Sequence, residues 1–205
     1  MKNIVCFGDS ITSGFNFPNS KTWPGFLQAE LDALSVDYDV YNRGIGGNTT
    51  INALDRFDAD VKEQLPAWVI IEFGFNDGSI RAGRSLARCN VSAFQDNLAE
   101  IVQLVRAKKG KPILLTNHPI APKFPTSKQG NGRDYTQNFK PYQPAIRAVA
   151  KKHKVPLIDL EKTMRKAGVR YSDLVCEDGM HLSREGNFIY AQFVLDGLRP
   201  LLGLK

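Results

Sequence analysis

Cysteine is scarce in this chain, and the three residues that occur, Cys6, Cys89 and Cys176, lie far apart. An odd number of widely spaced cysteines argues against a disulfide framework and against a zinc site built on closely spaced thiolates. A reducing compartment is the simpler interpretation. The N-terminus also has no signal-peptide pattern, which favours a cytoplasmic location, although a mature secreted chain would look similar.

Long hydrophobic runs, internal repeats and low-complexity segments are absent as well. No apolar run approaches the length of a membrane span, so stable membrane insertion is not expected. The net charge is +6, but the basic residues are scattered, and the densest run (151–154) falls at a predicted helix end, where cations suit the helix dipole. No nucleic-acid-binding motif occurs, so no nucleic-acid partner is expected.

What the chain does contain is a regular alternation of short apolar runs and amphipathic segments. Its 205 residues, 42% of them hydrophobic, are enough for one globular domain over residues 1–205. The periodicity predicts strands at 4–7, 38–42, 68–73, 113–116 and 157–160, and helices at 23–34, 90–107, 142–152 and 184–198. This order predicts an α/β fold, a three-layer α/β/α sandwich around a flavodoxin-like parallel sheet of about five strands.

One segment, residues 117–141, breaks this pattern. Prolines, glycines, lysines and polar residues dominate there, and Phe124, Tyr135 and Phe139 lie among them. A loop of this length is usually functional or mobile. Its aromatic and basic side chains suit a sugar or an anionic substrate, but an ordinary surface loop has a similar composition. The sequence does not decide whether the loop closes over a site.

The first predicted strand ends at Gly8-Asp9-Ser10. In an open α/β sheet, ligands bind just outside the carboxyl ends of the strands. Ser10 is therefore a candidate nucleophile. Serine and aspartate are also ordinary turn residues, so this stretch alone does not distinguish a nucleophile from a turn.

A hydroxyl nucleophile needs a base, and the base usually needs an orienting group. The chain has three histidines. His153 lies among lysines on a predicted helix, and His118 follows the fourth predicted strand without an acidic neighbour. His181 has Asp178 three positions before it in a glycine-containing turn, where a carboxylate can fix the tautomer of the ring. An aspartate that caps a helix before an ordinary histidine gives the same pattern.

Two further residues are candidates to stabilise a developing negative charge. Gly47 lies where the glycine-rich loop 44–50 enters a predicted helix, so its N–H can face a ligand, and the Asn76 amide follows the third strand. Simple turns explain both equally well. A non-catalytic binding module, with loop 44–50 around a phosphate or a flavin, is the alternative from another functional class, but it leaves Asp178 and His181 without a role.

In combination, these segments resemble the four sequence blocks of the SGNH (GDSL-type) hydrolases, in family order and over nearly the whole chain. The blocks are Gly8-Asp9-Ser10, Gly47, Gly74-Phe75-Asn76-Asp77 and Asp178-Gly179-Met180-His181. Ile11 stands where the family name has leucine, which is a like-for-like apolar replacement. Gly47 is assigned in preference to Gly46 because Asn-Thr-Thr follows it.

The resemblance implies catalytic roles. Ser10 would be the nucleophile, His181 the general base and then the acid, and Asp178 the residue that orients His181. The Ser10 N–H, the Gly47 N–H and the Asn76 side chain would form the oxyanion hole.

The resemblance also bears on residues around this set. Asp9 and Asp77 would hold their turns. Asp9 and His118 are further candidates for contact with the substrate.

The implied reaction is acyl transfer to water through an acyl-enzyme, with no metal and no cofactor. The family includes lipases, lysophospholipases, thioesterases, arylesterases and carbohydrate acetylesterases. We expect a short-chain acyl ester, with acetyl as the first candidate, on a small molecule or a carbohydrate. A lysophospholipase or thioesterase-type acyl hydrolase is the alternative.

Overall fold

A five-stranded parallel sheet forms the centre of the computed structural model, which describes residues 2–120 and 128–204. The strand order is β2-β1-β3-β4-β5. The bounds are β1 Lys2–Gly8, β2 Tyr38–Gly44, β3 Trp68–Glu72, β4 Lys111–Leu115 and β5 Leu157–Ile158. The predicted α/β fold with a flavodoxin-like parallel sheet is confirmed, because this strand order is the flavodoxin-like one.

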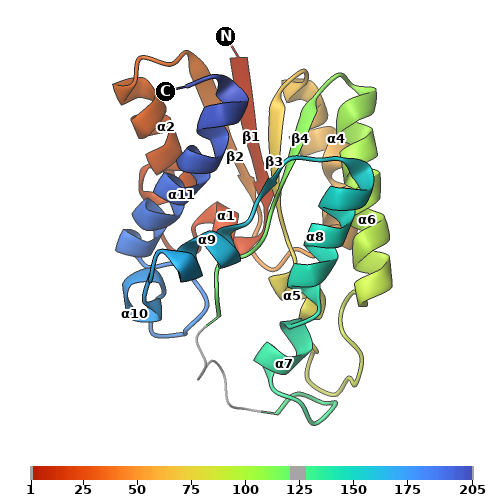
Figure 1. Ribbon diagram of the computed structural model, residues 1–205. Coiled ribbons are helices and arrows are strands. Elements are labelled where there is room, and N and C mark those ends of the chain that lie inside the picture. The colour runs from red at the N-terminus through yellow and green to blue at the C-terminus, as the bar shows by residue number, and fades with distance from the viewer. Residues whose placement is uncertain (1, 121–127, 205) are drawn as a thin grey trace.

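The longer helices cover both faces of the sheet (Figure 1). Helices α2 and α11 pack together on one face, and α6 and α8 pack together on the other. The helices are α1 Ser10–Ser13, α2 Trp23–Ala33, α3 Thr50–Asp55, α4 Phe57–Asp60, α5 Phe75–Gly78, α6 Val91–Ala107, α7 Tyr135–Phe139, α8 Tyr142–His153, α9 Leu160–Lys166, α10 Tyr171–Leu174 and α11 Arg184–Leu202, with 3₁₀ turns at Asn19–Lys21 and Lys62–Gln64.

The core follows from the composition of the strands. Residues 4–7 of β1 are a continuous apolar run, and none of them has any exposed surface. Such a run suits a strand that is covered on both faces by helices. Phe7 packs edge-on against Phe57 and Phe73 on one side, and Trp23 of α2 packs against Tyr190 of α11.

The register of the sheet decides which loops meet. Gly8 at the end of β1 lies opposite both Gly44 at the end of β2 and Glu72 at the end of β3. These three strands therefore end at one level. The segments that follow them, which carry Ser10, Gly47 and Asn76, leave the sheet at the same edge, as expected for a parallel sheet.

Two elements differ from the sequence prediction near the end of the chain. The strand expected at 157–160 ends at Ile158, because the Asp159 carboxylate accepts a hydrogen bond from the Lys162 N–H (3.1 Å) and so caps α9. Helix α11 does not end at residue 198, as predicted, but continues through Pro200 to Leu202. The carbonyl that loses its donor there belongs to exposed Asp196.

The expected loop 117–141 is also partly wrong. It contains α7, whose first turn is closed by a capping box between Asp134 and Gln137. Residues 121–127 lie outside the described part of the chain, so Phe124 and the suggested lid are not described.

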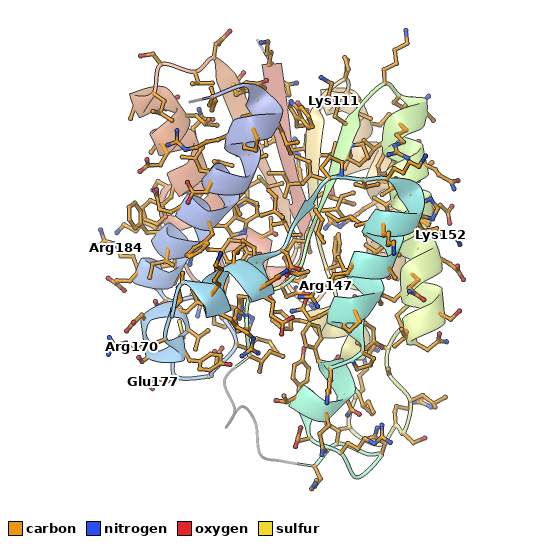
Figure 2. All side chains as sticks on the ribbon, viewed as in Figure 1. Lys111, Arg147, Lys152, Arg170, Glu177 and Arg184 are labelled. Atoms are coloured by element: carbon orange, nitrogen blue, oxygen red, sulfur yellow. The ribbon has the colours of Figure 1, made fainter. Side chains whose placement is uncertain are left out.

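A partly exposed ion-pair network connects α8 to the segment after β5. Arg147 of α8 donates to Asp159 (2.8 Å) and to Glu161 at the start of α9 (2.8 Å), and Figure 2 shows it between these helices. The hydrogen bonds to Asp159 raise the pKa of Arg147 above its usual value. Within the described ranges, no helix has the length and apolar character needed to cross a membrane.

Candidate active site

Ser10 is held at the turn from β1 into α1. Asp9 is the N-cap of this short helix, and its carboxylate accepts a hydrogen bond from the Ile11 N–H (2.9 Å). The turn is tight enough to require glycine before it: a Cβ on Gly8 would lie 2.1 Å from the Thr12 hydroxyl oxygen. Ser10 retains a relative exposure of 9%, which leaves its hydroxyl at the surface of the site.

Ser10, His181 and Asp178 form one hydrogen-bonded chain. The Ser10 Oγ lies 2.9 Å from His181 Nε2, and His181 Nδ1 lies 2.5 Å from Asp178 Oδ2. An ionised carboxylate can only accept, so Nδ1 carries the proton and Nε2 presents a lone pair to the serine hydroxyl. The arrangement suits proton abstraction from Ser10.

The turn that carries His181 is organised by Asp178. Its Oδ1 accepts hydrogen bonds from the backbone N–H groups of Met180 and His181, each at 2.9 Å. Partial burial raises the pKa of Asp178, but the hydrogen bonds from the His181 ring and these N–H groups outweigh burial and bring it below its usual value. Asp178 is therefore ionised at neutral pH.

Phe15 covers the His181 ring, and the sequence analysis did not identify it. The two rings are stacked, with centroids 4.0 Å apart and planes within 8°. Phe15 has a φ of +53°, which is rare for a bulky side chain, and it remains half exposed at the mouth of the site. An exposed ring held in a strained backbone conformation beside a reacting group is typical of functional sites.

The expected oxyanion donors lie in the segments that follow β1, β2 and β3. Ser10 is the first residue of α1, so its N–H has no intrahelical acceptor. Gly47 has a φ of +78°, and its N–H has no hydrogen-bond acceptor among the described residues. The Asn76 Nδ2 donates to Asp9 Oδ2 (3.1 Å) and retains a second N–H for a ligand.

Asp77 fixes the position of the loop that contains Gly47. Its Oδ1 accepts from the Thr50 N–H (2.9 Å) and from the Thr50 hydroxyl (2.6 Å), so the end of β3 is tied to the start of α3. This is the turn-holding role that the resemblance implied for Asp77. The analogous role of Asp9 is visible in its bonds to Ile11 and Asn76.

Arg88 joins the two donor segments and was also missed from the sequence. Its guanidinium donates to the Gly47 carbonyl (2.8 Å) and to the Asn76 Oδ1 (3.3 Å). Since guanidinium has no acceptor, it fixes the Asn76 amide with oxygen toward Arg88 and nitrogen toward Asp9. Arg88 lies in an irregular segment with two other arginines, where no sequence pattern distinguishes a site residue from a solvated one.

Two carboxyl groups are buried behind the Ser10 turn. Burial is the main cause that raises the pKa of Asp9 to about 7, and burial together with the charge of Asp9 raises that of Glu72 well above its usual range. Glu72 accepts hydrogen bonds from the Thr12 hydroxyl (3.0 Å) and from the Asn117 side chain. These carboxyls therefore retain protons where exposed ones lose them.

The two residues suggested as substrate contacts, Asp9 and His118, are fully buried. The His118 Nδ1 bonds to the Pro119 carbonyl (2.9 Å), and burial lowers the pKa of His118 to about 4, so the ring is neutral at pH 7. Neither side chain reaches a surface that a substrate can touch. We therefore do not include them among the substrate contacts of the site.

Tyr135 and Phe139, two of the three aromatic residues considered for sugar binding, are likewise internal. Tyr135 and Phe139 are both buried and pack around Phe75, and the Tyr135 hydroxyl donates to the Phe75 carbonyl. In the described ranges, no group of three or more His, Cys, Asp or Glu side chains is arranged to hold a metal ion.

Comparison with known proteins gives consistent matches over the whole chain. The model of the GDSL-like Lipase/Acylhydrolase family matches residues 6–188. Thioesterase 1/protease 1/lysophospholipase L1 of Escherichia coli K12 is 27% identical over 97% of this chain and 84% of that protein. The isoamyl acetate-hydrolyzing esterase 1 homolog of Bos taurus is 29% identical over 98% of this chain and 82% of that protein.

A solved structure gives the same result. The lipase/acylhydrolase from Enterococcus faecalis superposes with a TM-score of 0.80 at 27% identity, over 98% of this chain and 97% of that one. The family resemblance drawn from four short sequence blocks is thus confirmed. The chain belongs to the GDSL-like lipase/acylhydrolase family and is a carboxylic ester hydrolase with the SGNH hydrolase fold.

Proposed function

We propose that the protein hydrolyses short-chain acyl esters, acetyl esters first among them, through an acyl-enzyme on Ser10. The observation that carries this proposal is the unbroken chain from Ser10 Oγ through His181 to Asp178, with contacts of 2.9 and 2.5 Å. The relative from Bos taurus whose name specifies an acetate ester supports the choice of acetyl.

The proposed mechanism has two halves. The Ser10 Oγ attacks the ester carbonyl while His181 Nε2 takes its proton, and the resulting oxyanion accepts hydrogen bonds from the Ser10 N–H, the Gly47 N–H and the Asn76 Nδ2. His181 then gives the proton to the leaving alcohol. Water repeats the sequence on the acyl-enzyme, which releases the acid and restores Ser10. Asp178 holds the ring and stabilises its positive charge throughout.

A second candidate is a lysophospholipase or thioesterase activity in the same site. It is favoured by the name of the Escherichia coli relative, which includes both activities. Carbohydrate esters remain a candidate substrate class, but Tyr135 and Phe139, two of the three aromatic residues that suggested a sugar, are buried.

The test is a series of 4-nitrophenyl esters from acetyl to dodecanoyl, assayed with wild type and Ser10→Ala. We expect hydrolysis confined to the shortest chains, and its loss in the variant without a change in thermal unfolding. Preference for long chains would favour the second candidate. Activity that persists in Ser10→Ala would refute the proposed nucleophile.

A further inference from the structure

A second hollow lies beside the loop that carries Gly47. It has a volume of about 570 Å³ and lies between the start of α3 and the segment that joins α5 to α6. Its lining includes three guanidinium groups and two large aliphatic side chains. We call it the arginine pocket and define it by Arg81, Arg84, Arg88, Ile51 and Leu86.

Three positively charged side chains gather in the arginine pocket. None of the ion pairs within residues 2–120 and 128–204 includes Arg81, Arg84 or Arg88. The sequence has no acidic residue between Asp77 and Asp96, and none in 121–127. Burial and then the charge of Arg81 lower the pKa of Arg88, whereas the charges of Asp77 and Asp9 oppose this shift.

Arg88 connects the arginine pocket to the proposed catalytic centre. The same guanidinium that lines the pocket donates to the Gly47 carbonyl and to the Asn76 side chain. One side chain of the pocket lining thus contacts both segments that carry the expected oxyanion donors Gly47 and Asn76. A surface of one charge sign beside a reaction centre concentrates ligands of the opposite sign.

The backbone of the pocket is anchored, so the guanidinium groups project from a defined frame. The Arg88 N–H donates to the Ser79 carbonyl (2.9 Å), and the Cys89 N–H donates to the Asp77 carbonyl (3.1 Å). Gly130 packs against the Arg84 carbonyl so closely that a Cβ there would lie 1.8 Å from the oxygen. This contact braces the far side of the pocket.

Apolar surface accompanies the charge. Leu86 has a relative exposure of 79%, and Ile51 is also half exposed. Exposed large aliphatic side chains beside cations suit a ligand that carries a short apolar stretch and an anionic end. Guanidinium binds carboxylate and phosphate groups through paired N–H donors.

We propose that the arginine pocket is a substrate subsite that binds an anionic group, a carboxylate or a phosphate, of the ester whose acyl group is transferred to Ser10. This inference rests on the proposed function and specifies its substrate class. The anion can belong either to the acyl part or to the alcohol part of the ester. In both cases the three guanidinium groups meet the negatively charged oxygen atoms of a carboxylate or a phosphate.

Two matched substrate pairs distinguish these sources. Mono(4-nitrophenyl) succinate against 4-nitrophenyl butyrate places a carboxylate in the acyl part of the ester. Acetylglycerol phosphate against acetylglycerol, followed by acetate release, places a phosphate in the alcohol part. The readout for each pair is the ratio of kcat/KM for the anionic ester to kcat/KM for the neutral ester.

The variant is Arg81→Gln/Arg84→Gln, which leaves Arg88 in place. We expect the ratio to fall roughly tenfold or more in at least one pair, the order expected when a charge-assisted hydrogen bond is lost. The matched control is Lys151→Gln/Lys152→Gln, which removes the same charge from exposed positions in the last turn of α8. Figure 2 shows Lys152 near the end of α8 that is remote from α7. The control should leave both ratios unchanged.

The outcomes separate the two proposals. Ser10-dependent hydrolysis of the neutral esters tests the proposed function independently of the pocket. Hydrolysis with ratios that Arg81→Gln/Arg84→Gln does not change would overturn the subsite alone. An equal fall in the control would also overturn it, because the effect would then come from net charge. Absence of Ser10-dependent hydrolysis would overturn the proposed function and the subsite together.

Discussion

Arg88→Gln is the perturbation that most directly tests how the oxyanion donors are positioned. It removes the donor to the Gly47 carbonyl (2.8 Å) and the donor to Asn76 Oδ1 (3.3 Å). The second contact selects one of the two orientations of the Asn76 amide, and only that orientation directs nitrogen toward Asp9 and Ser10. Without it, the amide is free to populate the orientation that cannot donate.

The fall in kcat caused by Arg88→Gln should not exceed the fall caused by loss of Asn76, because we expect Arg88 to act through Asn76. Complete loss of one oxyanion donor lowers kcat by about 100- to 1,000-fold, which is the expectation for Asn76→Ala. Arg88→Gln leaves the donor present but less well oriented, so we expect kcat to fall roughly 10- to 100-fold. The oxyanion forms only in the transition state, so KM should change little.

The assay is steady-state hydrolysis of 4-nitrophenyl acetate by wild type, Arg88→Gln, Asn76→Ala and the double variant. If Arg88 acts through Asn76, the double variant is no slower than Asn76→Ala alone. Arg106→Gln is the matched control, since Arg106 also bridges two groups, the carbonyls of His153 and Lys154, far from the site.

Two results would refute the reasoning about Arg88. One is a double variant slowed by the product of the two single effects, which would mean that Arg88 acts independently of Asn76. The other is a rise in KM with unchanged kcat, which would mean that Arg88 binds substrate in the ground state. Thermal unfolding of each variant shows whether a loss of activity is merely a loss of fold.

Three further predictions concern the groups around Ser10. Phe15→Ala removes the ring stacked on His181 and should lower kcat/KM roughly two- to tenfold. Phe15→Tyr keeps an aromatic ring and should retain the wild-type kcat/KM. A wild-type kcat/KM in Phe15→Ala would contradict a positioning role for Phe15. Asp178→Asn should impair turnover less than His181→Ala, because misorienting a base is milder than losing it, and equal residual rates would contradict that ranking. Because Asp9 and Glu72 have raised pKa values, the folded state retains protons that the unfolded state releases. The free energy of unfolding should therefore fall as pH rises from about 5 to 7, by about 1.4 kcal/mol per pH unit for each proton. Urea titrations of Glu72→Gln at several pH values should show a shallower dependence of this free energy on pH, and an unchanged dependence would count against the buried protons.

Local sequence patterns were sufficient to predict those strands and helices whose own residues have a clear periodicity or a capping residue. Residues 4–7 are apolar without interruption, and they form a strand that helices cover on both faces. Asn90, the first residue of the predicted helix 90–107, accepts a hydrogen bond from the Ala93 N–H and caps α6. Alternation of such elements was enough to predict the parallel sheet and its flavodoxin-like type.

Contacts between distant segments were not predictable in the same way. Arg88 meets Gly47 and Asn76 only because β2 and β3 end at one level of the sheet, and Phe15 meets His181 across most of the chain. Tyr135 appeared to belong to a polar loop, but its side chain is buried against Phe75. In each case the partner is remote in sequence, so no local periodicity records the contact.

The sequence by itself determined the fold class, the family and the short segments in which chemistry is expected. It did so because hydrophobic periodicity is a local property and because the four blocks containing Ser10, Gly47, Asn76 and Asp178-x-x-His181 are short enough to recognise. Only the tertiary structure decided which side chains around those blocks face the site. It buried Asp9 and His118, placed Arg88 between two donor segments and gathered Arg81 and Arg84 in the same pocket as Arg88. Packing and strand register set where each side chain points, and both are non-local.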